Sequence, residues 1–383
     1  MKRFLLIPLL VLLGGVLVLS GCGAPAPAPP PSPAPKPAVS PAPAPSPTSA
    51  PAPAATPVKQ KTWTLKLSHN QTNINYMHVY GHEPWAKDVE RVTKGRVKVE
   101  IYPNSTLMLE KGSWEGTKSG IAEVSWFSTW KFPGQFEFLD STALPFIMHP
   151  KAEVCSRVAW TLFQKYPEIQ SQFADVKMLT VWTTEPYIFA TSKKQIKTLE
   201  DFRGLKMRMT TSPSIEMMKL LGGVPLTVTM PDCYMNLQKG VMDGMATPAE
   251  AVVGFRLYEV LKYFTMVPTT CSPQMLIMNK EAWNELPPDI QQAIMSVSGE
   301  SLSMRYGKMA FDKSWEELPD IATKAGYNLV NYTPPQEEID RWVAVAGKPV
   351  WDNWVKTVKA KGCARAQEIL DETIKLVKQY GSG

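Results

Sequence analysis

Residues 199–248 read LEDFRGLKMRMTTSPSIEMMKLLGGVPLTVTMPDCYMNLQKGVMDGMATP, and this stretch decides the fold class. Residues 204–209 have the composition of a short strand, and residues 215–221 have that of a helix. The pair Gly222-Gly223 ends this helix, and a second helix is expected over residues 231–239. Because strands and helices alternate along the chain, the stretch predicts an α/β fold.

The same order of elements opens the part of the chain that follows residue 60. Residues 63–68 alternate between polar and apolar side chains as a strand does, and residues 97–101 repeat that alternation. A helical segment from about residue 78 to residue 93 separates the two strands. This order favours a layered α/β sheet, whereas beyond Glu281 the pattern becomes mostly helical.

The first 22 residues have the features of a secretory signal. A basic start is followed by an apolar run over residues 4–19, which is short for a membrane span of roughly 20 residues. The ending Leu19-Ser20-Gly21-Cys22 resembles the bacterial lipobox, whose cysteine is acylated and becomes the mature N-terminus. We therefore expect residues 1–22 to be a lipoprotein signal peptide and Cys22 to anchor an extracytoplasmic protein to the cell membrane. The alternative is an ordinary cleaved signal with a chance cysteine.

Residues 23–60 are mostly Pro, Ala, Ser and Thr, a composition that predicts a disordered tether without a core. The whole chain has 41 basic and 35 acidic residues, a net charge of +6. Four of the basic residues precede residue 61, which leaves 37 basic against 35 acidic residues in the rest. A chain so nearly balanced lacks the positive surface of a nucleic-acid-binding protein, and this class is excluded.

Apart from Cys22, the cysteines are Cys155, Cys233, Cys271 and Cys363. None of them forms a CxxC pair or lies beside histidines at the spacing of a zinc site. A disulfide can form outside the cytosol, but the spacing does not fix which pair would form it. Buried free thiols are the default expectation.

Arg208 is the strongest candidate for a binding residue. It lies at the C-terminal end of the predicted strand, just before Ser212-Pro213, where we expect a helix to begin with Ser212 as its N-cap. Ligands of open α/β sheets bind beyond the carboxyl ends of strands, where a helix N-terminus offers N–H groups to an anion. An arginine at this point can bind a carboxylate through two parallel hydrogen bonds. The alternative is a surface arginine paired with a nearby Asp or Glu.

Three stretches resemble the solute-binding subunits of TRAP transporters, the tripartite ATP-independent periplasmic systems, in their DctP-type family. They are VKVEIYPNSTL at residues 97–107, PGQFEFLDSTALPF at residues 133–146, and the stretch quoted above with its continuation to YEVLKYFT at residues 258–265. Their order and spacing match those of the family over roughly residues 62–300.

The resemblance implies a two-lobed, periplasmic-binding-protein-like α/β fold, type II-like, with hinge strands and a long C-terminal helical region. Lobe I would comprise residues 61–185 and about 274–313, and lobe II residues 186–273 and about 314–383. The implied function is to capture a small organic acid outside the cytoplasm and to deliver it to a TRAP-type membrane permease. No cofactor is implied.

The resemblance also implies a set of site residues. The carboxylate-binding arginine of the family falls on Arg208, which the strand argument reached independently. Asn70 and Ser128 match ligand-contacting positions, and Thr247 stands where the family often has an asparagine. Met230 takes the place of an apolar pocket wall. The other expected pocket residues are Trp126, Trp130 and Tyr187.

The strand that precedes the Arg208 strand departs from one branch of the family. Sialic-acid binders carry a second arginine there, whereas residues 185–189 of this chain read EPYIF. Together with the aromatic residues, this absence predicts a monocarboxylate ligand with an apolar or aromatic body. The alternative is that these aromatic side chains belong to the core.

Other functional classes find less support. The chain has no GxSxG, GxxxxGK[ST] or GxGxxG motif, so we expect no catalytic residues and no enzyme. His78 and His82 have a spacing that can bind zinc, but the HExxH order is absent, so we expect a structural or solvent-facing role and no metal. A lipid-anchored adhesion or structural module without a ligand is the remaining alternative, and it predicts no ordered pocket around Arg208.

Overall fold

The structure, a computed structural model, describes residues 61–382. The predicted signal peptide (residues 1–22), the lipidated Cys22 and the tether (residues 23–60) lie outside the described residues. Among the described residues, no helix is both long enough and apolar enough to cross a membrane.

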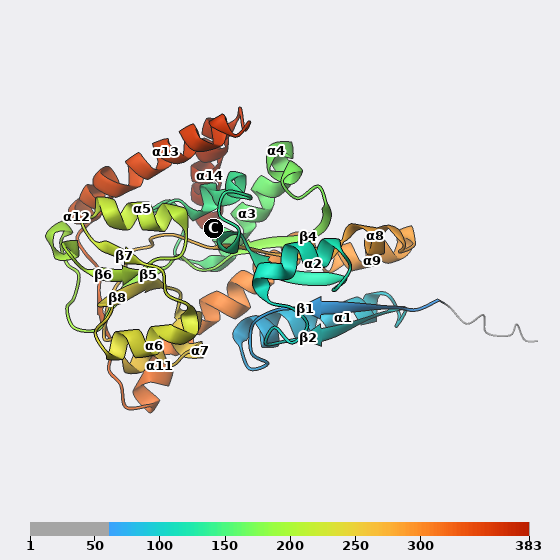
Figure 1. Ribbon diagram of the computed structural model, residues 1–383, viewed down its shortest axis with the longest axis horizontal. Helices are drawn as coiled ribbons and strands as arrows, with labels where there is room; N and C mark the ends of the chain where they lie inside the picture. Colours follow the sequence, from blue (N-terminus) through green and yellow to red (C-terminus); the bar gives the residue numbers. More distant parts are fainter. Residues whose placement is uncertain (1–60, 383) are drawn as a thin grey trace, which may run out of the picture. The chain divides into compact units, whose positions relative to one another are not determined.

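The first of two sheets has the strand order β2-β1-β3-β10-β4 (Figure 1). Strands β2, β1 and β3 pair in parallel, whereas β10 runs antiparallel to both of its neighbours, β3 and β4. Helices α1, α9 and α10 cover one face, and α2 and α3 cover the other. The strands are β1 (Trp63–Ser68), β2 (Val97–Tyr102), β3 (Val124–Ser128), β4 (Val176–Thr183) and β10 (Pro273–Asn279).

The second sheet has the order β11-β9-β5-β8-β6-β7. Figure 1 shows α5, α12 and α13 above this sheet and α6, α7 and α11 below it. Neighbouring residues of β8 therefore serve different cores, with Met245 packed against α6 and α7 and Ala246 on the α5 side. The strands are β5 (Ile188–Thr191), β6 (Lys206–Arg208), β7 (Val224–Leu226), β8 (Gly244–Thr247), β9 (Tyr263–Thr265) and β11 (Val330–Tyr332).

The helices bear out the predicted α/β class and the helical C-terminal region. The α-helices are α1 (Glu83–Val92), α2 (Ser113–Lys118), α3 (Ala152–Lys165), α4 (Pro167–Ser171), α5 (Ser212–Leu220), α6 (Met230–Gln238), α7 (Ala249–Gly254), α8 (Lys280–Asn284), α9 (Pro288–Ser296), α10 (Gly299–Arg305), α11 (Lys313–Lys324), α12 (Gln336–Trp342), α13 (Lys348–Ala360) and α14 (Ala366–Gly381). The 3₁₀ turns are η2 (Glu110–Gly112), η3 (Thr129–Lys131), η4 (Glu137–Ala143), η5 (Leu199–Phe202) and η6 (Leu257–Glu259), and the π-helical turns are η1 (His78–His82), η7 (Tyr306–Asp312) and η8 (Val343–Gly347).

Two extended segments cross side by side from one sheet to the other. Residues 184–187 connect β4 to β5, and residues 266–272 connect β9 to β10. The Tyr187 N–H donates to the carbonyl of Thr270 at 2.8 Å, and the Thr269 N–H donates to the carbonyl of Tyr187 at 2.8 Å. A third crossing is the helical run α10–η7–α11, which packs on α3 at one end and on α7 at the other.

The predicted lobe boundaries stay a proposal, and one group of contacts bears on them. Helix α14 packs on α3, where the hydroxyls of Tyr380 and Thr161 lie 3.2 Å apart. The hydroxyl of Thr373 donates to Ser141 Oγ at 3.0 Å. These contacts favour placing α14 with lobe I, although the sequence-based division placed the whole of residues 314–383 in lobe II.

The four cysteines Cys155, Cys233, Cys271 and Cys363 are all free and buried in this structure.

Three of the four histidines in the chain form a buried cluster beside the helical crossing. His69 Nε2 and His78 Nδ1 lie 3.0 Å apart, and the rings of His69 and His82 stack with their centroids 4.4 Å apart. His82 Nδ1 is hydrogen-bonded to the hydroxyl of Tyr306 at 2.7 Å. Burial lowers the pKa of His69 to about 3 and, with the neighbouring imidazoles, lowers the pKa of His82 well below its usual value.

We expect acid to destabilise the fold through this cluster. Below about pH 6.5, histidines of the unfolded chain take up protons, whereas His69 and His82 of the folded chain stay neutral. Each of the two should therefore lower the free energy of unfolding by roughly 1.4 kcal/mol per pH unit between about pH 6.5 and the folded-state pKa. Urea denaturation at pH 7, 6 and 5 measures this slope. In His69→Gln the slope of the unfolding free energy against pH should be smaller by the contribution of one histidine, roughly 1.4 kcal/mol per pH unit. An unchanged slope would contradict this role of His69.

Candidate functional site

Arg208 is the last residue of β6, a strand that lies between β7 and β8. Its side chain is only 3% exposed, whereas Lys206 on the same strand is exposed. The Nε–H of Arg208 donates to the carbonyl of Val228 at 2.8 Å, which fixes the plane of the guanidinium. Within residues 61–382, no carboxylate lies within the 4.0 Å that defines an ion pair with this guanidinium. The geometry is therefore not that of a surface arginine paired with an acid.

Helix α5 begins immediately beyond β6, and its N-cap is Thr211. Thr211 Oγ1 accepts from the N–H of Ser214 at 3.2 Å, and Ser214 Oγ accepts from the N–H of Thr211 at 3.0 Å. The predicted N-cap, Ser212, is thus wrong by one residue, because this reciprocal pair satisfies the helix end from Thr211. Pro213 lies in the first turn, where its missing N–H costs nothing.

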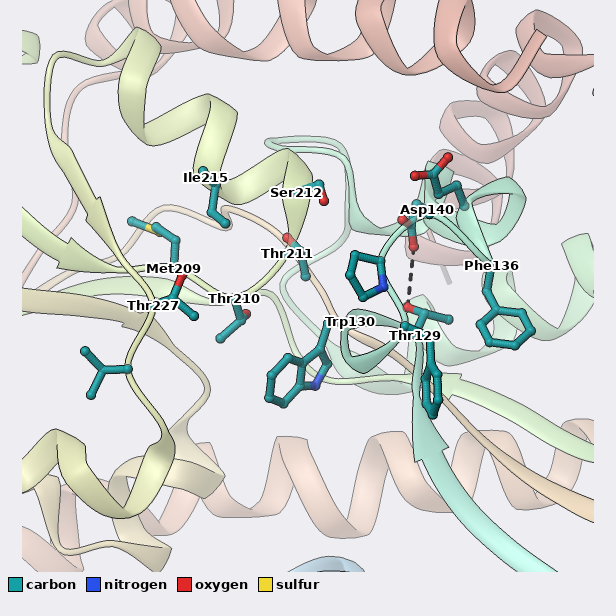
Figure 2. A pocket seen from close by; sticks show the side chains of 15 residues that line it. Thr129, Trp130, Phe136, Asp140, Met209, Thr210, Thr211, Ser212, Ile215 and Thr227 are labelled. Atoms are coloured by element: carbon teal, nitrogen blue, oxygen red, sulfur yellow. Dashed lines mark hydrogen bonds between the residues drawn. The ribbon is translucent and has the colours of Figure 1, made fainter. Parts of the chain in front are cut away.

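A cavity of about 240 Å³ lies between the segment after β3 and the segments after β6 and β7. Figure 2 shows Thr129 and Trp130 on one side of this cavity, with Thr210, Thr211 and Ser212 on the other. Val228, the hydrogen-bond partner of Arg208, is also part of the wall, whereas Arg208 itself is not. The lining residues are Thr129, Trp130, Phe132, Pro133, Gly134, Phe136, Glu137, Asp140, Met209, Thr210, Thr211, Ser212, Ile215, Thr227 and Val228.

Glu110 joins two of the predicted site residues. Ser128 Oγ donates to Glu110 Oε1 at 2.5 Å, and Asn70 Nδ2 donates to Glu110 Oε2 at 2.9 Å. Lys131 Nζ lies 3.9 Å from the same Oε2 atom. Burial raises the pKa of Glu110 to about 7, although Ser128 and Lys131 act in the opposite direction. The sequence shows Glu110 as one carboxylate among many, and only the fold brings it between these partners.

Lys131 is a second cation close to Arg208. Its ammonium lies 3.7 Å from the centroid of the Trp130 ring, which lines the cavity. Burial lowers the pKa of Lys131, Glu110 raises it, and the positive charge of Arg208 lowers it further. Sequence reasoning missed this residue, although its place directly after Trp130 was visible.

The remaining predicted residues lie in different surroundings. Tyr187 is buried in a crossing segment near Arg208, whose charge opposes the rise of the Tyr187 pKa to about 12 that burial causes. Trp126 lies in the core of the first sheet, where its Nε1–H donates to Gln274 Oε1 at 3.2 Å. Met230 is the first residue of α6 and is half-buried. Thr247 is fully buried at the end of β8 and lines a separate cavity of about 110 Å³ beside the crossing segments.

Of the eight predicted ligand-binding residues, only Trp130 belongs to the wall of the cavity of about 240 Å³. Arg208 is joined to this wall by its hydrogen bond with Val228, and Ser128 directly precedes the wall residue Thr129. Asn70 shares Glu110 with Ser128, and Tyr187 lies in a crossing segment outside the wall. Between residues 61 and 382, no group of three or more His, Cys, Asp or Glu side chains has the geometry to hold a metal ion.

The sequence matches known proteins over most of its length. The family described as bacterial extracellular solute-binding protein, family 7, matches residues 67–357. The C4-dicarboxylate-binding periplasmic protein of Rhodobacter capsulatus is 28% identical over 282 residues, which cover 72% of this chain and 81% of that protein. The 2,3-diketo-L-gulonate-binding periplasmic protein of Escherichia coli K12 is 24% identical over 269 residues, which cover 70% of this chain and 79% of that protein.

Solved structures match the fold as well. A TRAP solute-binding protein from Rhodoferax ferrireducens T118, in complex with copurified benzoate, superposes with a TM-score of 0.76 at 26% identity, over 83% of this chain and 98% of that chain. A TRAP periplasmic solute-binding protein from Desulfovibrio salexigens, in an open complex, superposes with a TM-score of 0.74 at 25% identity, over 83% of this chain and 96% of that chain. The predicted two-lobed α/β fold is thereby confirmed.

The N-cap of α5 provides a test of the local structure at the site. We expect Thr211→Ala to lower the free energy of unfolding by about 1 kcal/mol, because the Ser214 N–H loses its acceptor. Thr210→Ala is the matched control, since the neighbouring Thr210 hydroxyl is buried without a partner among the described residues. Urea denaturation of both variants measures the difference, and equal effects would contradict the assignment of the cap.

Proposed function

The chain belongs to the bacterial extracellular solute-binding protein family 7, and we propose that its ligand is a small monocarboxylate with an apolar or aromatic body, held by Arg208. It is an extracytoplasmic solute-binding protein of the TRAP type, which binds a small organic acid and works with membrane permease subunits.

The observation that carries the proposal is the state of Arg208. A buried cation without a counter-ion is costly, because desolvation is not offset by a partner. Arg208 is 3% exposed, its Nε–H is satisfied by Val228, and no acid of the described chain pairs with it. The two remaining nitrogens of the guanidinium have the fork geometry that binds a carboxylate through two hydrogen bonds. A carboxylate ligand supplies the missing counter-ion.

The cavity wall supports a ligand with an apolar body. Trp130 and Phe136 line it from the first lobe, and Met209 and Ile215 line it from the second. The crossing segment beside Arg208 presents Tyr187 instead of a second arginine. One relative structure holds benzoate, whereas the name of another relative specifies C4-dicarboxylates. Since ligands differ within the family, the ligand class here rests on the residues of this chain.

The proposed mechanism is closure of two lobes around the acid, followed by release to the permease. The crossing segments 184–187 and 266–272 would act as hinges, with Arg208 on one lobe and Trp130 on the other. In the closed state the proposed ligand contacts also include Asn70, Ser128, Tyr187, Met230 and Thr247. Trp126, which lies in the core of the first sheet, is proposed to support the site from that core. The family match gives no support to the alternative of an adhesion module without a ligand.

We also propose that Cys22 carries the lipid anchor and that residues 23–60 tether the binding domain to the membrane. The lipobox-like ending at Cys22 and the Pro/Ala-rich composition support this proposal.

Substitution of Arg208 tests the binding role. We expect Arg208→Ala to weaken binding of the cognate acid by roughly 2–5 kcal/mol, because a desolvated carboxylate is left poorly paired. A thermal-shift screen of residues 61–383 against aliphatic, aromatic, keto, hydroxy and dicarboxylic acids first identifies the acid, and titration calorimetry then compares the variants. Lys206→Ala, on the same strand but exposed, is the matched control and should bind as the wild type does. Equal affinity of Arg208→Ala and the wild type would rule out this role.

The anchor is tested separately in cells. The full-length chain should fractionate with membranes, and Cys22→Ser should release it because the acylated sulfur is lost. Metabolic labelling with a clickable palmitate analogue should mark the wild type alone. Label that persists in Cys22→Ser would place the lipid elsewhere.

A further inference from the structure

Lys131 occupies a defined position opposite Arg208. It belongs to η3, directly after β3, and thus to the lobe that does not contain Arg208. Its ammonium lies over the Trp130 ring at 3.7 Å, and that ring faces Thr210 and Thr211 across the cavity. Neither cation belongs to the cavity wall, but each contacts a wall residue: Lys131 lies over the Trp130 ring, and Arg208 donates to the carbonyl of Val228.

Glu110 compensates one of these two cations. Its Oε2 lies 3.9 Å from Lys131 Nζ, and its two oxygens already accept from Ser128 and Asn70. The side chain of Glu110 is 6% exposed, so its charge is little screened by water. Above the Glu110 pKa of about 7, where this carboxyl is ionised, Arg208, Lys131 and Glu110 together carry one net positive charge.

The other charged side chains of the cavity wall are Glu137 and Asp140, which follow Trp130 and Lys131 in the same segment after β3. Glu137 Oε2 pairs with Lys361 Nζ at 2.5 Å, and Asp140 Oδ1 accepts from the Thr129 hydroxyl at 3.4 Å. Burial, followed by the charge of Glu137, raises the pKa of Asp140 to about 7. Substitutions of Glu110 or Lys131 leave Glu137, Lys361 and Asp140 in place.

We propose that the Glu110–Lys131 pair selects the charge of the ligand, so that the site takes one carboxylate and rejects a second one. This inference rests on the proposed function, since it assigns ligand selectivity to the same site. A ligand with one carboxylate neutralises the surplus charge at Arg208. A second carboxylate would need Lys131, which Glu110 already occupies, and would face the negative charge of Glu110 itself.

Substitution of Glu110 and substitution of Lys131 should change the preference for a monocarboxylate in opposite directions. Glu110→Gln keeps the shape of the side chain but removes its charge, so Lys131 becomes available to a second carboxylate. Lys131→Met keeps an apolar stem over Trp130 but removes the ammonium that a second carboxylate would need, so a second carboxylate should bind even less well. Glu115→Gln is the matched control, because Glu115 is an exposed acid of the neighbouring helix α2.

The experiment measures dissociation constants by titration calorimetry at pH 8 for two matched pairs, benzoate with terephthalate and butyrate with succinate. The wild type should prefer the monocarboxylate of the pair that binds, and Glu110→Gln should reduce this preference about tenfold. Lys131→Met should increase the preference while weakening the monocarboxylate itself. An unchanged preference in both variants would overturn the inference.

The pH provides a second readout with its own control. As the pH falls from 8 to 6, Glu110 of the wild type takes up a proton, so the preference should shift towards the dicarboxylate, as it does in Glu110→Gln at pH 8. The variant lacks this group and should shift less, while any contribution of Asp140 is common to both proteins. Equal shifts in the two proteins would count against Glu110.

The outcomes separate this inference from the proposed function. If no acid binds the wild type, or if Arg208→Ala binds as well as the wild type, the carboxylate site itself is wrong. If acids bind and their binding depends on Arg208, but the preference for a monocarboxylate is unchanged in the Glu110 and Lys131 variants, only the proposed charge selection is wrong. A circular-dichroism melt of each variant shows whether it is folded, and Lys131→Met carries the test should Glu110→Gln fail to fold.

Discussion

A buried arginine without an acid partner is the constraint on which the account of this protein depends. The fold meets the constraint in part by fixing Arg208 between β7 and β8 and by giving its Nε–H the carbonyl of Val228. The end of the strand then places the guanidinium beside the first turn of α5, which Thr211 caps. Within residues 61–382 no acidic side chain pairs with this guanidinium, and the proposed function is to bind a ligand that supplies the missing carboxylate.

The crossings between the sheets explain how such a site can be both enclosed and accessible. Two hydrogen-bonded segments and the run α10–η7–α11 connect the lobes, so the cavity wall is built from both sheets. Hydrogen bonds of Asn75 with Glu250 and of Tyr76 with Glu317 also join the segment after β1 to α7 and α11. One apolar cluster also contains residues of both sheets, Phe127 of β3 and Phe189 of β5 among them.

The sequence predicted those features whose cause is local. The alternation in residues 63–68 and 97–101 identified β1 and β2, and the strand end identified Arg208. The N-cap of α5 was predicted at Ser212, whereas the structure has it at Thr211. In the run Thr211-Ser212-Pro213 either hydroxyl residue could cap the helix, and only the reciprocal hydrogen bonds of Thr211 with Ser214 identify the cap. Long-range pairing was beyond reach: Glu110 meets Asn70 from 40 residues away and Ser128 from 18. Likewise, only the packing of β3 shows that Trp126 enters the core while Trp130 lines the cavity.

A crystal structure of residues 61–383 with its bound acid would show whether Arg208 holds the carboxylate. Both carboxylate oxygens should lie about 2.7–2.9 Å from the two terminal nitrogens of Arg208, with the body of the acid towards Trp130. A carboxylate bound elsewhere, with Arg208 still unpaired or turned to an acid of the chain, would contradict that role.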